Sequence, residues 1–307
     1  MTTTQTHLTR LALLAALALQ AAGCSGLAGK VAARALTSGG DAYATDDDPE
    51  LVRDAVPFGL KTMEGVLESQ PQDVRLLQSL AAGFTQYGFA FVATDADQAD
   101  WSGKLQEAKA LRLRARHLFL LARGYGLRAL DERREGLGTA LLGARDPAAV
   151  LARARPEDVP ALYWTASAWV LAIVNGKGEM GLVAELPVPV AMMERARALD
   201  EGWGEGALHE FFLSYLPGVA PAEGGGAWRA LAERDRALAL SMNKKLGPRV
   251  AYAEAVLIPA QDRTAFAAEL EAVLKADPDE TPRFRLVNVL AQRRARLLLE
   301  HLDDLFL

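Results

Sequence analysis

The side chains that most often carry out covalent or metal chemistry are few in this sequence and widely spaced. Beyond the first 23 residues the histidines are His117, His209 and His301, and Cys24 is the only cysteine, so no spacing typical of a zinc or iron site occurs. His209 precedes Glu210 directly, but adjacent residues on a helix do not face each other and cannot form an acid–base pair. The nucleophile-elbow, phosphate-loop and dinucleotide-binding patterns do not occur either. The sequence therefore predicts no catalytic residue, no metal and no cofactor, and hence a protein that is not an enzyme.

The first 23 residues have the three parts of a secretory signal peptide. A polar opening with His7 and Arg10 precedes an apolar run from Leu11 to Leu19, and small residues then lead to Cys24. This pattern resembles a bacterial lipoprotein lipobox, whose cysteine is acylated after cleavage, although Ala21 stands where leucine is commonest. Because a lone thiol has no partner for an internal disulfide, lipidation is its expected use.

We therefore predict a signal peptide at residues 1–23 and lipidation at Cys24. Two alternatives remain open, namely an ordinary signal peptide that is cleaved nearby and an N-terminal apolar anchor. Ser25 rather than aspartate follows the cysteine, which in lipoproteins of this kind suggests the outer membrane. Residues 24–47 are small and polar, and they are predicted to form a flexible tether between the lipid and the body of the protein.

Charge and hydropathy limit the possible partners. The chain has 34 Lys and Arg and 39 Asp and Glu, and cleavage removes Arg10 but no acid, so the mature chain has a net charge of about −6 (33 minus 39). This balance argues against nucleic acid as the main partner. Arg112, Arg114 and Arg116 form a basic run, which we interpret as a solvated helix face that pairs with acids rather than as an anion site. No apolar run beyond the leader reaches membrane-spanning length, so we expect the lipid alone to hold the body at the membrane.

Residues 48–307 have the pattern of one all-helical domain, because no stretch alternates apolar and polar residues for long enough to propose a sheet. Asp48 and Pro49 are typical of a helix start, with the aspartate as N-cap and the proline in the first turn. We favour this interpretation over a cation site built from Asp46 to Asp48. The stretch from Ala161 to Val174 is apolar almost all round, which indicates a helix that is buried on every side.

Three predicted helix ends resemble one another, which indicates an internal repeat. They read GVLESQPQD from Gly65, RALDEGWGE from Arg197 and AVLKADPDE from Ala272, and each precedes a helix rich in small and aromatic residues. This is typical of tetratricopeptide-like helical hairpins, although the spacing departs from their usual period of about 34 residues. We predict an all-α fold built as a divergent array of such hairpins, either an α-solenoid or a compact repeat bundle. A generic helical bundle with alanine-rich contacts is the alternative.

Three stretches also carry a resemblance to a known family. They are the lipobox at Cys24, the segment from Asp47 to Val92, and the sequence YWTASAWVLAIV from Tyr163 to Val174. Together with the later hairpins they resemble the T component of tripartite ATP-independent periplasmic (TRAP) transporters. The resemblance implies a periplasm-facing lipoprotein of tetratricopeptide-like helices, similar to proteins that form a trimer with a passage through each subunit. It further implies a periplasmic solute-binding protein as partner and the transfer of an apolar or amphiphilic organic ligand.

Aromatic side chains on the small-residue helices are the candidates for a ligand site, since helical arrays bind their ligands on concave faces. The alternative is that each of these rings belongs to the core. The candidates are Tyr87, Phe91, Tyr163, Trp164, Trp169, Phe211 and Tyr215.

Two functions fit these expectations. The first is a lipid-anchored accessory protein of a TRAP-type transporter that docks a solute-binding protein and helps to route its ligand. The second is an envelope scaffold that uses the same helical surface for protein–protein interaction, with no small-molecule ligand. The family resemblance favours the first, and neither charge nor periodicity separates them.

Overall fold

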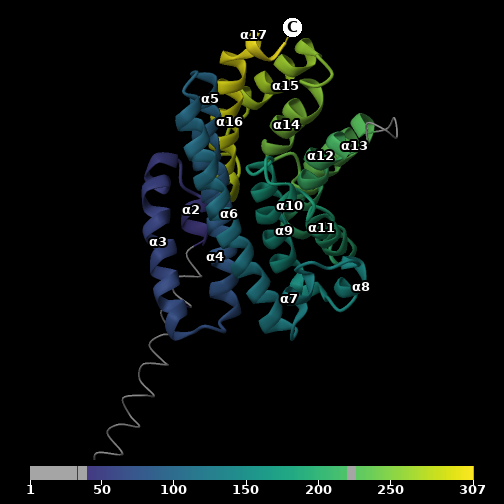
Figure 1. Cartoon of the computed structure of the whole chain (residues 1–307). Helices are drawn as coiled ribbons and strands as arrows, with labels where there is room; N and C mark the ends of the chain where they lie inside the picture. The colour runs from purple at the N-terminus through teal and green to yellow at the C-terminus, as the bar shows by residue number, and fades with distance from the viewer. Residues whose placement is uncertain (1–32, 34–39, 220–225, 307) are drawn as a thin grey trace, which may run out of the picture.

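A computed structural model describes residue 33 and residues 40–219 and 226–306, all of it helices and connections without a strand (Figure 1). This confirms the predicted all-α fold. The predicted signal peptide and Cys24 lie outside the described residues. The longer helices are α3 (Pro49–Ser69), α4 (Val74–Tyr87), α5 (Thr94–Trp101), α6 (Leu105–Arg133), α9 (Val159–Val174), α11 (Pro187–Leu199), α12 (Ala207–Val219), α13 (Gly226–Leu240), α15 (Arg263–Lys275) and α16 (Arg285–Glu300).

Short elements connect these helices. The short α-helices are α2 (Gly40–Ala44), α7 (Leu137–Leu141), α8 (Pro147–Leu151), α10 (Met180–Val183), α14 (Gly247–Tyr252) and α17 (Leu302–Leu305). Single turns of 3₁₀-helix form η2 (Pro156–Asp158), η3 (Trp203–Glu205) and η6 (Pro282–Phe284), and π-helical turns form η1 (Gly88–Ala93) and η5 (Ala253–Leu257).

Aspartate side chains fix where several helices begin. The Asp48 carboxylate accepts hydrogen bonds from the backbone N–H groups of Glu50 and Leu51 at 3.0 and 3.1 Å, with Pro49 in the first turn, which confirms the predicted start of α3. The other capping aspartates, which precede α4, α8 and α15, are Asp73, Asp146 and Asp262. Each cap satisfies backbone donors that the first helical turn leaves without a partner.

The end of α12 differs from the prediction. The pattern from Gly206 to Leu216 predicts a helix ended by Pro217 and Gly218, but α12 runs from Ala207 to Val219. A proline beyond the first turn removes one backbone hydrogen bond and crowds the carbonyl four residues earlier, and here the helix continues for only two residues after it. The prediction therefore ended the helix three residues too early.

Helix α9 lies at the centre of the main hydrophobic core and packs against α4, α6 and α11. No residue from Val159 to Ile173 is exposed, although several are only partly buried, whereas Val174 is 49% exposed. The predicted buried helix from Ala161 to Val174 is therefore confirmed except at its last residue. The seam with α6 is very close, because a Cβ added at Gly126 would stand 2.0 Å from Oγ1 and 3.2 Å from Cα of Thr165. Only glycine fits at this position of α6 without moving α9.

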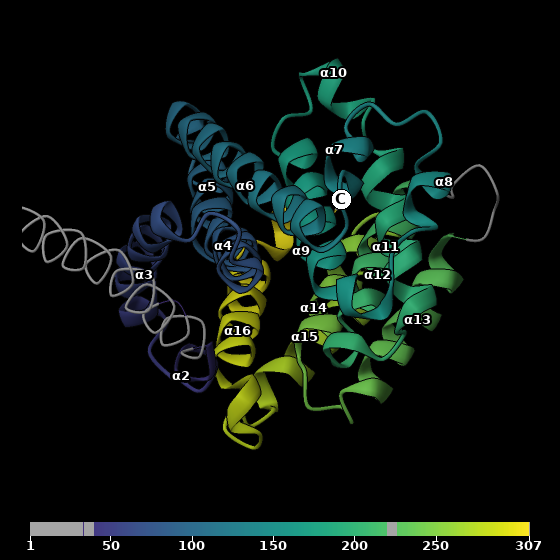
Figure 2. The same cartoon turned by 90° about the horizontal axis from the view of Figure 1, so that it is seen from below.

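The last long helix returns to the first ones. A second hydrophobic core is built mainly from α14, α15 and α16, and α16 also packs against α2 and α3 (Figures 1 and 2). Arg293 of α16 lies 2.6 Å from the Glu50 carboxylate of α3, and the Trp101 ring at the end of α5 stacks on His301 with centroids 4.8 Å apart. The two ends of the described body therefore hold each other. The tetratricopeptide-like character of the hairpins stays a prediction.

Helix α2 occupies part of the segment that was predicted as a tether. It contacts α16 and η6, and the Arg285 guanidinium donates a hydrogen bond to the backbone oxygen of Thr45 at 3.1 Å. The proposed boundaries at residues 23 and 47 stay predictions.

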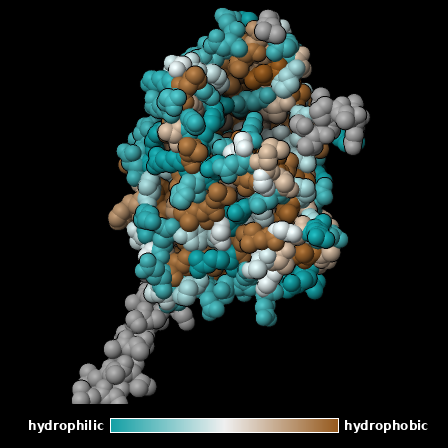
Figure 3. Space-filling view, viewed as in Figure 1, coloured by the Kyte–Doolittle hydropathy of each residue, from teal (hydrophilic) through white to brown (hydrophobic). Residues whose placement is uncertain are grey.

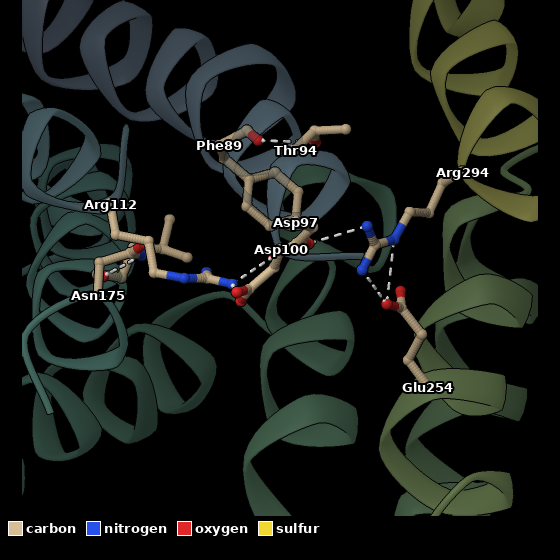
Figure 4. A network of polar contacts seen from close by, with 9 residues as sticks. Phe89, Thr94, Asp97, Asp100, Arg112, Asn175, Glu254 and Arg294 are labelled. Atoms are coloured by element: carbon tan, nitrogen blue, oxygen red, sulfur yellow. Dashed lines mark hydrogen bonds and ion pairs between the residues drawn. The ribbon is translucent and has the colours of Figure 1, made fainter. Parts of the chain in front are cut away.

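A charged network on α5 joins the helices of the N-terminal half to those of the C-terminal half (Figure 4). Asp97 lies 3.1 Å from Arg112 of α6 and 2.9 Å from Arg294 of α16. Arg294 also contacts Glu254 of η5 at 2.5 Å, and its guanidinium lies 5.2 Å from the centre of a ring of Trp101. One carboxylate on α5 thus connects α6 with α16.

Candidate functional site

The seven predicted aromatic side chains come from α4, η1, α9 and α12, and they form separate groups. On the α4 side, the rings of Tyr87 and Phe91 are 5.6 Å apart, and the Arg53 guanidinium lies 5.8 Å from the centre of the Phe91 ring. On α12, the rings of Phe211 and Tyr215 stack with centroids 5.8 Å apart. Ligand contact by these rings stays a prediction.

The third group combines two predicted residues with one that the prediction missed. Tyr163 and Trp164 of α9 lie 4.9 Å apart, and both contact Trp203 in η3, at 4.6 and 6.4 Å between ring centroids. Trp203 stands between two glycines in a tight turn, and a large aromatic residue in such a turn is the signal that could have identified it. We call Tyr163, Trp164 and Trp203 the Trp203 cluster.

Trp169 differs from the other candidates because none of its surface is exposed. Its indole N–H donates a hydrogen bond to Glu185 at 2.8 Å, and the Arg123 guanidinium lies 4.7 Å from the centre of a ring of the indole. Arg123 also pairs with Glu185 at 2.9 Å. In this conformation Trp169 packs in the core and has no free surface for a ligand.

A charged pair lies beside the Trp203 cluster. The Lys245 ammonium is 3.4 Å from the Glu210 carboxylate and donates a hydrogen bond to the backbone oxygen of Gly204 at 2.6 Å. Burial raises the pKa of the Glu210 carboxyl above its ordinary value, and Lys245 opposes that shift. Burial and the nearby charge of Glu210 also raise the pKa of Tyr163. A carboxyl group with a shifted pKa beside a group of aromatic rings is a candidate functional group.

Sequence reasoning considered Glu210 only as a neighbour of His209, and the structure confirms that the two side chains do not pair. His209 instead contacts Glu233 of α13 through Nδ1, and its Nε2 lies 3.2 Å from Glu201. Glu233 lies 24 residues from His209 and Lys245 lies 35 residues from Glu210 along the chain, so no local pattern indicates these two contacts.

Glu210 leads to a prediction about pH. Because the folded pKa of this carboxyl is raised, its contribution to stability is present when it is protonated and is lost as the pH rises through the folded pKa. Between about pH 5 and about pH 8, the wild type should therefore lose more free energy of unfolding than Glu210→Gln, whose amide cannot ionise. Urea unfolding of both proteins across this range checks the difference.

The control for this prediction is Glu68→Gln, because Glu68 is an exposed glutamate on α3. Its dependence on pH should follow that of the wild type. Equal pH dependence of Glu210→Gln and the wild type would contradict the assignment.

The surface has two hollows, and none of the seven predicted aromatic residues lines either of them. One has a volume of about 490 Å³ and lies between α6 and residues 175–179, and the other has a volume of about 380 Å³ and involves α14 and α15. The first hollow contains two residues of the basic run. Arg112 pairs with Asp97 and Asp100, and Arg116 pairs with Glu179, which confirms for these two arginines the predicted pairing with acids.

The described residues show neither a metal centre nor a membrane-spanning helix. Among the described residues, no group of three or more His, Cys, Asp or Glu side chains is placed to hold a metal ion. Within the same part of the chain, every helix is too short or too polar to cross a bilayer. The helical fold carries grouped aromatic rings and a basic hollow on its surface.

The chain belongs to the TRAP transporter T-component family, whose family model matches residues 45–306. This confirms the resemblance inferred from the sequence and supports an accessory role in a TRAP transporter, in a family that is not a family of enzymes. A component of such a transporter is associated with the cell envelope. The chain is also similar to a protein of Treponema pallidum (strain Nichols) that is described as an uncharacterized protein, with 27% identity over 267 residues, 86% of this chain and 82% of that protein.

Proposed function

We propose that this protein is a lipid-anchored periplasmic accessory subunit of a TRAP-type transporter that docks the transporter's solute-binding protein. The observation that carries the proposal is the match of the T-component family to residues 45–306, which include nearly the whole helical body. An accessory subunit needs surfaces for partners rather than a catalytic centre. Grouped aromatic rings and a basic hollow are such surfaces.

The anchor in this proposal is a lipid on Cys24, left at the N-terminus after removal of residues 1–23. Ala33 is already buried in the main hydrophobic core and α2 packs against α16, so the tether from the lipid would end before residue 33. The outer membrane is the favoured location, because Ser25 follows the cysteine. By family resemblance the subunit would assemble as a trimer.

The ligand in this proposal is an apolar or amphiphilic organic molecule that passes between the solute-binding protein and this subunit. The Trp203 cluster supports it best among the aromatic groups, since Tyr163, Trp164 and Trp203 are only partly buried and lie beside the Glu210–Lys245 pair. Aromatic faces bind the apolar part of such a ligand, and a few charged groups can orient its polar end.

The test is affinity purification of the tagged, lipidated protein after mild cross-linking of intact envelopes, with partners and stoichiometry read by mass spectrometry. Recovery of a solute-binding protein in near-equal ratio, on a self-associated subunit, is the expected result. Recovery of envelope-assembly proteins without any TRAP component would instead support the scaffold function.

A Cys24→Ala variant is the control for the anchor. It should lose the acyl label and appear in the soluble periplasmic fraction, whereas the wild type should remain with the membrane. Retention of the alanine variant in the membrane fraction would mean that Cys24 is not the anchor.

A further inference from the structure

The hollow between α6 and residues 175–179 is elongated along one helix face. Leu105, Lys109, Arg112 and Arg116 line it and recur every three or four residues, so this face of α6 lines the hollow over about 16 Å. The opposite wall is the turn that follows α9. Figure 3 has the same view as Figure 1, in which α6 and α10 are labelled. On this face of the molecule, hydrophobic residues lie among hydrophilic ones. We call this hollow the α6 groove.

The α6 groove is basic in a chain whose formal net charge is −5. Its lining contains more cations than carboxylates. The cations are Lys109, Arg112, Arg116 and Lys177, and the carboxylates are Asp100 and Glu179. The two arginines are paired with acids. Neither lysine has a carboxylate within ion-pair distance in the described part of the chain, so two positive charges are available for a partner.

The floor of the groove is fixed by a close contact. A Cβ added at Gly176 would stand 2.9 Å from Cδ of Arg116 and 3.0 Å from the backbone oxygen of Ala172. The stem of Arg116 therefore lies directly on the glycine backbone, while its guanidinium is held by Glu179. Because these groups are already in place, a partner loses little free energy in ordering them.

The rim of the groove is apolar and exposed. Leu105 and Leu113 are 65% and 46% exposed, and Val174 and Met180, which flank the turn in sequence, are 49% and 75% exposed. Leu105 and Leu113 line the groove itself, and Val174 and Met180 are the chain neighbours of the lining residues Asn175 and Glu179. A small molecule in a binding pocket has most of its surface buried, and this rim would leave much of it in water. A protein segment would cover both the groove and the rim.

We propose that the α6 groove docks an acidic, amphipathic helical segment of a protein partner. The carboxylates of the segment would meet Lys109 and Lys177, and its apolar side chains would cover Leu105 and Leu113. A flat anionic membrane surface fits less well, because the two unpaired lysines face a groove. The inference rests on the proposed function for the identity of the partner, which would be a component of the TRAP transporter.

A photo-cross-linker in the groove tests the proposal in intact cells. Leu113→p-benzoylphenylalanine in the full-length lipidated protein should capture a protein, and the cross-linked peptide should carry Asp or Glu with apolar residues at helical spacing. Leu142→p-benzoylphenylalanine is the matched control, since Leu142 is 52% exposed but follows α7. Capture of a lipid, of a peptide without acidic residues, of the same protein from both positions, or of nothing would overturn the proposal.

Charge reversal separates this inference from the proposed function. Lys109→Glu combined with Lys177→Glu should reduce the yield of the cross-link at least tenfold. The control is Lys61→Glu combined with Lys275→Glu, which changes the net charge by the same amount. These two lysines are 75% and 77% exposed and lie outside the groove, so the cross-link should be unchanged. If the purified wild type binds the solute-binding protein and the groove variant binds it equally well, the groove inference fails and the proposed function stands. If the captured acidic segment belongs to a protein outside the transporter, the groove inference stands and the proposed function fails.

Discussion

Replacing Trp169 by alanine is expected to lower the free energy of unfolding by about 3–5 kcal/mol. Trp169 is among the largest fully buried side chains of the described protein and lies on α9, in the main core. Its loss would leave a cavity in that core. It would also remove the donor that contacts Glu185 and the ring beneath the Arg123 guanidinium. Chemical denaturation followed by circular dichroism measures the effect.

Two variants show whether burial causes this loss. Trp169→Phe keeps most of the ring and should cost less than the alanine variant, because only the hydrogen bond and part of the volume are lost. Trp164→Ala removes the same kind of side chain five residues earlier on α9, but Trp164 is partly exposed, so its effect should be smaller. A cost for Trp164→Ala equal to that for Trp169→Ala would show that burial in α9 does not determine stability.

Replacing Asp158 by alanine is the second large effect, with an expected loss of about 3 kcal/mol in the free energy of unfolding. Asp158 is fully buried at the start of α9. Its carboxylate accepts hydrogen bonds from Nε of Arg134 at 2.5 Å and from the backbone N–H of Arg155 at 2.8 Å. Alanine would leave both donors without this acceptor and would release the turn that leads into α9.

The neighbouring residue supplies the control for this prediction. Glu157 contacts the same arginine, Arg134, at 2.6 Å, but its side chain is 58% exposed. Because solvent screens an exposed pair, Glu157→Ala should have a clearly smaller effect than Asp158→Ala in the same unfolding measurement. Similar losses for both variants would mean that the burial of Asp158 does not set the strength of this contact.

Local features of the fold were predictable from the sequence because they depend on a few neighbouring residues. The cap at Asp48 needs only the following backbone N–H groups, and the apolar stretch from Ala161 to Val174 by itself indicates a buried helix. The family was also recognisable from such stretches.

The candidate site was less predictable because its contacts join distant parts of the chain. Trp203 lies about 40 residues after Tyr163 in sequence, and Lys245 comes 35 residues after Glu210. Helical periodicity indicates which residues are apolar but not which helices meet. For the same reason, the pattern did not show that Trp169 is fully buried while Trp164 keeps some exposed surface.

The return of α16 to α2 and α3 also affects when the protein can finish folding. Arg293 and Glu50 are 243 residues apart in sequence, so the first long helix of the described residues pairs with the last one to be synthesised. Domains generally begin to fold from the N-terminus as the chain emerges. Here the contacts of α3 with α16 cannot form until nearly the whole chain has been synthesised. A chain exported through a membrane in an extended form would suit this arrangement, because the seam between its ends cannot close until the last helix has crossed.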